Sequence, residues 1–231
     1  KQILYISRIE HPGKNHLTLL KAFELLPEDL RREYTLVMPG AGWNGAETVF
    51  EYAEKSPCKE QFKFTGFVDF AKLPELYAQS AMYIFPSHFE GFGLSLLEAM
   101  HAELPCACSN NSSLGELGEG AAELFDPASV QEISDAMKKI LTDRNCQQML
   151  SEKGRTKAAG FSWQNTAKGL TEVYRKRTAV VFDVPFFSGT MNEALDKIDT
   201  CVQSKSAHRI AFINAHCLNI AYKNKEYRQI L

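Results

Sequence analysis

The segment Phe89–Met100 combines two glycines with two carboxylates at a spacing suited to binding a phosphate and a sugar. It follows a predicted strand, Ala81–Phe85, and leads into a helix predicted to begin near Gly93. Glycine allows a ligand to approach the backbone closely, and the amides at a helix N-terminus carry a partial positive charge that favours a phosphate. A nucleoside diphosphate is therefore a candidate ligand of this segment.

Glu90 and Glu98 stand on either side of this candidate phosphate site. Glu98 follows Gly93 by five positions, which corresponds to about 7 Å along a helix. A diphosphate at the helix end would leave an attached ribose near Glu98 and a sugar near Glu90. The same residues also fit a glycine turn with two solvated carboxylates, and the segment alone leaves both interpretations open.

Arg8 and Lys14 lie in the segment Ser7–Asn15, directly after the predicted strand Ile3–Ile6. An arginine offers a forked, permanently charged contact to a diphosphate, and a lysine supplies a compact charge. Taken alone, the two residues also fit an ordinary strand end and helix start. The carboxyl ends of parallel strands meet at one sheet edge, however, so this segment and the glycine segment are expected to lie together.

The composition is that of an ordinary globular protein, because 45% of the 231 residues are hydrophobic and 23% are charged. It excludes a disordered, collagen-like or coiled-coil chain. The formal net charge of -2 argues against a broad basic surface for nucleic acid. Six cysteines without a C-x-x-C pair favour reduced thiols in a cytoplasmic protein. No membrane span or signal peptide is visible, and a chain that opens in a strand at Lys1 is expected to be part of a longer protein.

Short apolar runs alternate with stretches of helical periodicity along residues 1–177. This alternation predicts an α/β fold, a Rossmann-like parallel sheet with helices on both faces. In such sheets ligands bind outside the carboxyl ends of the strands. The predicted strands are Ile3–Ile6, Tyr34–Met38, Phe62–Thr65, Ala81–Phe85, Pro105–Ser109 and Glu123–Phe125.

The pattern restarts after residue 177, with a predicted strand Thr178–Val184, a turn Pro185–Gly189 and a helix capping box Thr190–Glu193. We therefore predict two domains, residues 1–177 and residues 178–231, of which the second is a partial α/β unit. About 54 residues are too few to bury a comfortable core alone. The second segment either packs on the first domain or opens a domain that continues in a longer chain.

Short motifs occur along the first domain in a fixed order: Ser7-Arg8 with Lys14-Asn15, Phe64–Val68, Phe85–Ser87, Glu90 and Glu98 with seven residues between them, Glu98–Met100, Asn111–Leu114, Leu124–Pro127 and Phe161–Trp163. In this order and spacing they resemble the carboxyl-terminal half of family 4 glycosyltransferases of the GT-B fold, from Ile3 to about Arg177. One departure is Gly115, where the family often has a proline before the glutamate.

The resemblance implies a retaining glycosyltransferase of the hexosyltransferase type that uses a nucleotide-diphosphate sugar in polysaccharide biosynthesis. Arg8 and Lys14 would neutralise the departing diphosphate, and Glu90 would contact the donor sugar; these three form the predicted catalytic set. The implied donor-binding residues are Phe67 and Val68 near the base, Phe92, Gly93 and Leu94 through their amides, and Glu98 at the ribose. No D-x-D motif occurs, so neither a metal nor another cofactor is expected.

Motifs in the second domain resemble a different family: Phe182–Phe186, Thr190–Leu195, Ile213–His216, Asn219–Ala221 and Glu226–Arg228. The similarity is to family 26, the N-acetylmannosaminyltransferases of teichoic-acid and enterobacterial-antigen synthesis, which use a UDP-sugar and a polyprenyl-diphosphate-linked acceptor. Asn214 matches a residue of that family's pocket motif. The Asp-Gly segment that carries the family's proposed catalytic aspartate is missing up to Leu231, so this domain is expected to be incomplete.

The expected partners are a nucleotide-sugar donor and a glycan or polyprenyl-linked acceptor, without nucleic acid. The expected localisation is cytoplasmic, with peripheral association of the longer protein at the inner face of the membrane. Because GT-B enzymes bind the acceptor mainly in an amino-terminal domain, the chain alone is expected to bind a nucleoside diphosphate and to transfer little sugar. A noncatalytic nucleotide-binding module and a nucleotide-sugar epimerase of the same fold remain alternatives. A two-carboxylate glycosidase is disfavoured, because a hydrolase needs no arginine and lysine for a diphosphate.

Overall fold

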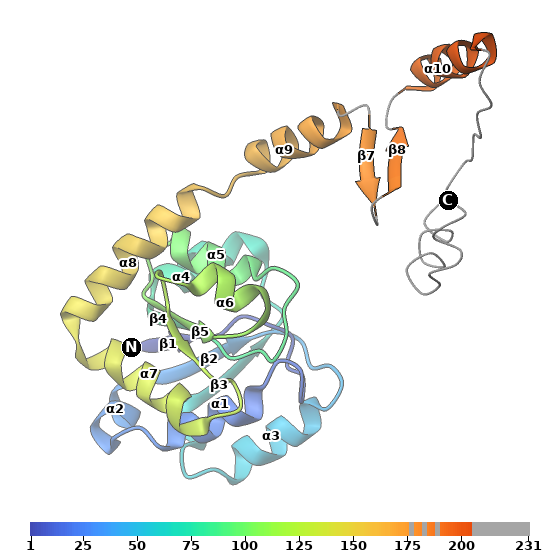
Figure 1. Cartoon of the computed structure of the whole chain (residues 1–231). Coiled ribbons are helices and arrows are strands. Elements are labelled where there is room, and N and C mark those ends of the chain that lie inside the picture. Colours follow the sequence, from blue (N-terminus) through green and yellow to red (C-terminus); the bar gives the residue numbers. More distant parts are fainter. Residues whose placement is uncertain (176–177, 182–183, 188–189, 205–231) are drawn as a thin grey trace. The chain divides into compact units, whose positions relative to one another are not determined.

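The chain forms two compact units, Lys1–Phe161 and a second that begins at Ser162. The computed structural model describes residues 1–175, 178–181, 184–187 and 190–204, and Figure 1 shows the elements of both units. The division by contacts falls before α9 (Trp163–Arg175). The domain boundary at residues 177 and 178 stays a prediction.

A six-stranded sheet forms the centre of the first unit, and every neighbouring pair of strands is parallel. The strand order is β3-β2-β1-β4-β5-β6, which confirms the predicted Rossmann-like fold class. The strands are β1 (Gln2–Leu4), β2 (Thr35–Pro39), β3 (Phe62–Gly66), β4 (Ser80–Phe85), β5 (Cys106–Ser109) and β6 (Glu123–Phe125). Strand β1 ends two residues before the predicted end at Ile6.

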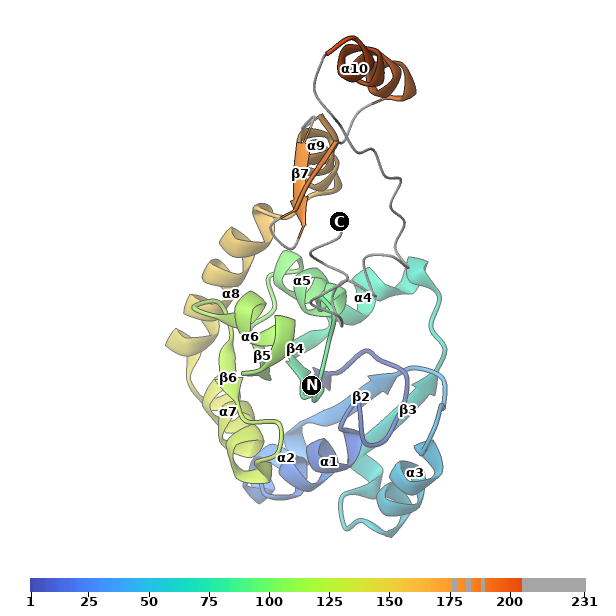
Figure 2. The same ribbon diagram turned by 45° about the vertical axis from the view of Figure 1, so that its right-hand side comes forward.

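Helices cover both faces of this sheet, because each crossover between parallel strands places a helix on one side or the other. Figures 1 and 2 show α1, α3 and α7 on one face and α4, α5 and α6 on the other. The helices of this unit are α1 (His16–Glu24), α2 (Glu28–Glu33), α3 (Ala46–Lys55), α4 (Leu73–Ala78), α5 (Leu94–His101), α6 (Ser112–Gly118), α7 (Val130–Thr142) and α8 (Arg144–Ala159).

The core lies on both faces of the central strands, which accounts for their continuous apolar sequence. Residues Met82–Phe85 of β4 and all four residues of β5 are buried. Four cysteines of this unit, Cys58, Cys106, Cys108 and Cys146, are buried free thiols. Burial raises the pKa of Cys108 to about 12 and that of Cys106 well above its ordinary value, so both behave as apolar core residues.

The second unit contains an antiparallel pair of strands where the sequence predicts a single strand. The strands β7 (Thr178–Val181) and β8 (Val184–Phe187) pair antiparallel, so the predictions of one strand to Val184 and of a turn from Pro185 are wrong. Pro185 fits a strand here because a two-stranded sheet has only edge strands, where a missing N–H is tolerated. The predicted capping box is confirmed, since Thr190 caps α10 (Met191–Gln203) together with Glu193.

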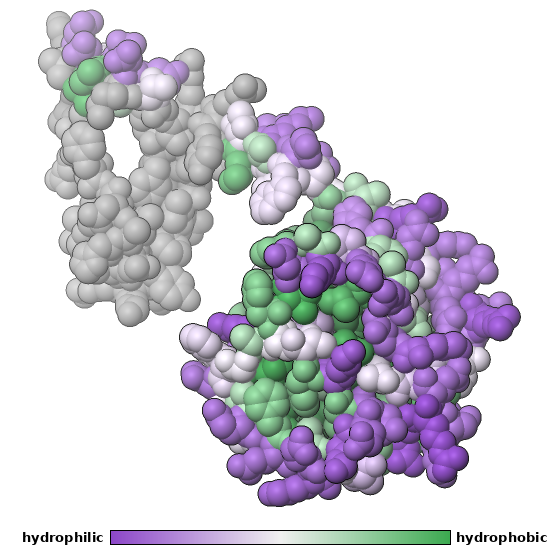
Figure 3. Space-filling view, turned by 180° about the vertical axis from the view of Figure 1, so that it is seen from behind, coloured by the Kyte–Doolittle hydropathy of each residue, from purple (hydrophilic) through white to green (hydrophobic). Residues whose placement is uncertain are grey.

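The surface of the first unit carries apolar as well as polar residues, and Figure 3 shows an apolar area bordered by polar side chains. Several exposed aromatic residues follow the carboxyl ends of β2, β3 and β4: Trp43, Phe67, Phe70, Phe89 and Phe92. Within the described part of the chain, we find no helix with the length and hydropathy needed to cross a bilayer.

Candidate functional site

The site lies where the order of strands reverses in the sheet. The chain passes from β1 to its neighbour β2 on one side, and from β4 to its neighbour β5 on the other. Because β1 and β4 pair with each other, the β1–α1 loop (residues 5–15) and the β4–α5 loop (residues 86–93) leave the sheet side by side. In open parallel sheets this reversal is the usual place for a ligand.

Hydrogen bonds fix the backbones of these two loops to one another. The Tyr5 hydroxyl donates to the Lys14 carbonyl oxygen over 2.7 Å and lies 3.2 Å from Ser87 Oγ. The His88 amide donates to the Gly13 carbonyl oxygen over 3.0 Å. The Tyr5 side chain is fully buried, so the link between the loops is shielded from water. Lys14 is therefore held at a defined distance from the residues that follow β4.

Asn15 extends this network to a third loop. Its backbone is left-handed, with φ of 62°, a conformation that asparagine tolerates better than most residues. Its buried side-chain amide donates to the carbonyl oxygens of Pro86 at 2.9 Å and Pro127 at 2.7 Å. The loops after β1, β4 and β6 thus meet at one side chain. The Lys14-Asn15 motif contains this residue, but nothing in the local sequence points to the two distant carbonyls.

Lys14 and Glu90 form a short ion pair, with Lys14 Nζ 2.6 Å from Glu90 Oε1. Only 19% of the lysine side chain and 15% of the glutamate side chain are exposed, so solvent screens the pair weakly. The main chain of Glu90 is fixed as well: its amide donates to Ser112 Oγ over 3.2 Å, and its carbonyl oxygen accepts from Ser113 Oγ over 2.9 Å. The structure therefore brings together these two residues of the predicted catalytic set.

Arg8 makes other contacts. Its Nη2 donates to Glu10 Oε2 over 3.1 Å, and its guanidinium carbon lies 5.3 Å from the centre of the Trp43 ring. Its side chain is 56% exposed. Within residues 1–175, no hydrogen bond or ion pair joins Arg8 to Lys14 or Glu90. Arg8 shares the β1–α1 loop with Lys14, but its side chain is held by a neighbouring carboxylate and an indole.

The glycine turn ends at Gly93, which caps the N-terminus of α5. Its φ of 101° favours glycine, and an added Cβ would lie 2.8 Å from Leu114 Cδ2. The first hydrogen bonds into the helix run from the amides of Leu96 and Leu97 to the Gly93 carbonyl oxygen, over 3.1 and 3.2 Å. The amides of the first turn, beginning with the exposed Leu94, precede those bonds. They are suited to an anion.

Glu98 lies on the exposed side of α5, and the buried Tyr77 of α4 holds its carboxylate. The Tyr77 hydroxyl donates to Glu98 Oε2 over 2.8 Å. Burial raises the pKa of Tyr77 above its ordinary value, and the charges of Tyr83 and Glu98 raise it further, so the hydroxyl keeps its proton. No local signal in the sequence marks Tyr77 as a partner of Glu98, because the two residues lie 21 positions apart.

The other predicted residues make no hydrogen bond or ion pair with Lys14, Glu90 or Glu98 within residues 1–175. Phe92 is half exposed, and its ring packs 5.9 Å from that of Phe161. Phe67 follows β3 and is 77% exposed, while Val68 is half-buried. Asn214 lies outside the described residues.

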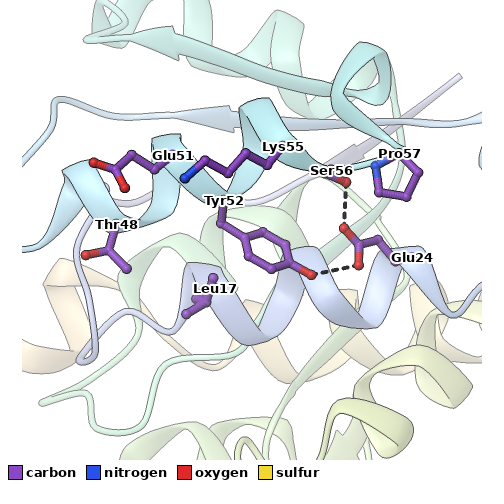
Figure 4. Close-up of a pocket in the computed structure, with 8 residues that line it drawn as sticks. All are labelled: Leu17, Glu24, Thr48, Glu51, Tyr52, Lys55, Ser56 and Pro57. Carbon is purple, nitrogen blue, oxygen red and sulfur yellow. Dashed lines mark hydrogen bonds between the residues drawn. The ribbon is translucent and has the colours of Figure 1, made fainter.

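A separate groove lies between α1 and α3, and none of the predicted site residues lines it. It encloses about 330 Å³ and is lined by Leu17, Glu24, Thr48, Glu51, Tyr52, Lys55, Ser56 and Pro57. Figure 4 shows Tyr52 and Ser56 directed at the Glu24 carboxylate, to which they donate over 2.7 and 2.5 Å. The groove is lined by two carboxylates, Glu24 and Glu51, and one cation, Lys55, so its charge does not favour a diphosphate.

Comparison with known proteins is consistent with this geometry. Residues 1–157 match the family model described as Glycosyl transferases group 1. The chain is 35% identical over 173 residues to the O-antigen chain mannosyltransferase B of Escherichia coli, covering 74% of this chain and 45% of that protein. It is 36% identical over 167 residues to the serotype-specific mannosyltransferase WbdA of Escherichia coli, covering 71% of this chain and 20% of that protein. The chain thus spans less than half the length of these relatives.

Solved structures share the fold at lower sequence identity. The sucrose-phosphate synthase of Thermosynechococcus elongatus superposes with a TM-score of 0.68 at 23% identity, over 76% of this chain and 45% of that protein. HepE of Anabaena, solved in complex with UDP and glucose, gives a TM-score of 0.68 at 21% identity, over 76% of this chain and 48% of that protein. Both likenesses concern the fold.

Proposed function

The chain belongs to the group 1 glycosyltransferases, and from this membership we propose that its first unit is the donor-binding half of a retaining enzyme of family 4. The donor is a nucleoside-diphosphate sugar, and the acceptor is a growing glycan or a polyprenyl-linked glycan. The two Escherichia coli relatives are named mannosyltransferases, which supports a hexose, with mannose the first to test. A lipid-linked acceptor would bring the longer protein to the inner face of the membrane.

The observation that carries this proposal is the Lys14–Glu90 pair beside the N-terminus of α5, at the reversal of strand order. Transfer breaks the bond between the anomeric carbon and a diphosphate oxygen, and that oxygen keeps the electron pair. The oxygen of an acceptor hydroxyl bonds to the same carbon, and its proton passes to the departing diphosphate. The growing negative charge is stabilised by fixed donors that are in place before the reaction. Lys14, Arg8 and the amides from Phe92 to Leu94 supply them in this proposal, without a metal ion.

Glu90 has two tasks in this proposal: it holds the Lys14 ammonium and it faces the donor sugar. Glu98 accepts hydrogen bonds from the ribose hydroxyls, and the exposed Phe67 with Val68 lies beside the base. HepE of Anabaena was solved with UDP and with UDP-glucose, which supports a nucleotide as a ligand of the shared fold.

The segment after residue 177 is proposed to begin a family 26 domain, with Asn214 in its pocket. The sequence motifs support this assignment, and the capped helix α10 is consistent with it. A polyprenyl-diphosphate-linked acceptor would then be common to both transferase domains of the longer protein.

Calorimetric titration of this chain with UDP and with GDP tests the proposed donor site. We expect at least one of them to bind, and we expect Lys14→Met to weaken that binding by about tenfold or more, as for the loss of a charged hydrogen bond. Lys55→Met is the matched control, because Lys55 lines the separate groove between α1 and α3. Absence of binding by both nucleotides, or equal binding by the two variants, would refute the donor site.

Sugar transfer is tested in a longer protein that contains this chain together with the acceptor-binding half. Nucleotide binding without transfer would favour the noncatalytic module. Conversion of the donor sugar without any acceptor would favour an epimerase.

A further inference from the structure

The contact between Tyr77 and Glu98 is not explained by packing alone. Only 4% of Tyr77 is exposed, yet its hydroxyl reaches the carboxylate of a residue on the solvent side of the next helix, 2.8 Å away. The same hydroxyl lies 3.4 Å from the Ser95 carbonyl oxygen. Both neighbours are acceptors on α5, so the hydroxyl proton points towards this helix.

We propose that Tyr77 is a positioning residue that orients the Glu98 carboxylate for the ribose hydroxyls of a bound nucleotide. This inference rests on the proposed function, in which Glu98 receives the ribose. Tyr77 itself does not touch the nucleotide in this account; it acts through Glu98.

The geometry leaves one carboxylate oxygen available for the ligand. Tyr77 binds Oε2, and Oε1 has no partner within residues 1–175. A carboxylate accepts several hydrogen bonds, so neighbouring ribose hydroxyls find free acceptor positions beside the occupied one. A free glutamate on a helix surface would sample several rotamers, and ordering it on binding would cost affinity. The bond to Tyr77 removes part of that cost before the nucleotide arrives.

The tyrosine ring is itself fixed, which makes it a suitable support. It packs 6.0 Å from the ring of Tyr83 on β4, whose hydroxyl reaches the Ile6 carbonyl oxygen over 3.4 Å. The support for Glu98 therefore continues through β4 to the β1–α1 loop. Because burial raises the pKa of Tyr77, the hydroxyl stays protonated and remains a donor at neutral pH.

The test compares ribonucleotides with deoxynucleotides on the complete 231-residue chain. Calorimetry measures the Kd of UDP and GDP, and of their 2′-deoxy and 3′-deoxy forms, for the parent and for Tyr77→Phe. We expect Tyr77→Phe to weaken the ribonucleotides about two- to tenfold, the range for ordering one side chain, while the deoxy forms change less. In a Glu98→Ala background, Tyr77→Phe should have no further effect on binding.

Tyr52→Phe is the matched control, because Tyr52 also donates to a glutamate, Glu24, over 2.7 Å, but in the groove between α1 and α3. We expect this variant to bind all the nucleotides as the parent does. Thermal unfolding of both variants measures how much each lost hydrogen bond destabilises the fold. A change in Kd can then be distinguished from a loss of stability.

The outcomes separate this inference from the proposed function. If Tyr77→Phe keeps the parent's full preference for ribonucleotides, the positioning role is wrong while the donor site stands. If the parent binds ribo- and deoxynucleotides equally, Glu98 does not hold the ribose, and the inference falls with that part of the proposed function. If the parent binds neither nucleotide, the proposed function itself is refuted.

Discussion

We predict that the chain loses about 2 kcal/mol of its free energy of unfolding between pH 7 and pH 5 because His16 is buried in its neutral form. His16 is the first residue of α1 and is fully buried. Its Nδ1 lies 3.3 Å from the Glu10 carbonyl oxygen, and its Nε2 lies 3.3 Å from Ser7 Oγ. The imidazole thus ties together the loop in which Arg8 and Lys14 lie.

Burial lowers the pKa of His16 from 6.5 to about 4. The hydrogen bond to the Glu10 backbone raises this pKa, whereas the charges of Lys14 and His11 lower it. Because the pKa in the folded chain lies below that of the unfolded chain, the unfolded chain takes up the proton first as the pH falls. The neutral imidazole therefore contributes its full stabilisation above about pH 6.5, and this contribution is lost as the pH falls towards 4.

The magnitude follows from the two pKa values. Their difference corresponds to about 3 kcal/mol in total, at about 1.4 kcal/mol for each pH unit. Most of this, about 2 kcal/mol, is lost between pH 7 and pH 5, where the unfolded histidine becomes charged and the buried one does not.

Urea unfolding followed by circular dichroism at pH 7, 6 and 5 measures this loss. His16→Gln removes the titrating group, so the difference between its stability at pH 7 and pH 5 should be about 2 kcal/mol smaller than in the parent. His101→Gln is the control, because His101 is exposed at the end of α5 and should leave the pH dependence unchanged. If His16→Gln retains the parent's pH dependence, the buried neutral imidazole is not its source.

Two further experiments test the links between the loops. In a double-mutant cycle by urea unfolding, Lys14→Met and Glu90→Gln should show a coupling energy of about 1–3 kcal/mol. This value lies between those of exposed and buried ion pairs, because both side chains are mostly buried. Additive effects of the two substitutions would show that the pair is energetically inert. Asn15→Asp should cost about 3 kcal/mol, because a carboxylate oxygen would replace the amide that donates to Pro86 and Pro127; an unchanged unfolding midpoint would contradict that role.

The fold could be predicted because its signals are local. Apolar runs of strand length alternate with helical periodicity, and the glycine turn ends where a helix begins, as Gly93 shows with its positive φ. The ends of elements were harder to place. Strand β1 leaves the regular ladder after Leu4, although the Tyr5 and Ser7 amides still donate to the carbonyl oxygens of Val37 and Pro39 in β2. Apolar sequence does not distinguish such a continuation from a strand.

The partners within the site could not be predicted in the same way, because they join residues far apart in the chain. The sequence suggests that Lys14 and Glu90 share a sheet edge, and the structure places them in contact. The sequence contains no sign that Asn15 would bridge to residues 71 and 112 positions away. Arg8 was expected to act beside Lys14, but spacing says nothing about side-chain direction, and its guanidinium lies against Glu10 and Trp43.

The cations proposed for the diphosphate are already paired with carboxylates, Arg8 with Glu10 and Lys14 with Glu90. The summed charge of the four side chains is zero. A diphosphate that binds Arg8 or Lys14 must therefore compete with the carboxylate already paired with that residue. The Lys14 pair is shorter and more buried than the Arg8 pair, at 2.6 against 3.1 Å, and exposed pairs are weakly held. Arg8 is therefore the cation that exchanges its partner at the lower cost. Trp43 is uncharged, and its ring attracts the positive charge of the Arg8 guanidinium. This contact therefore persists when Arg8 exchanges Glu10 for a diphosphate.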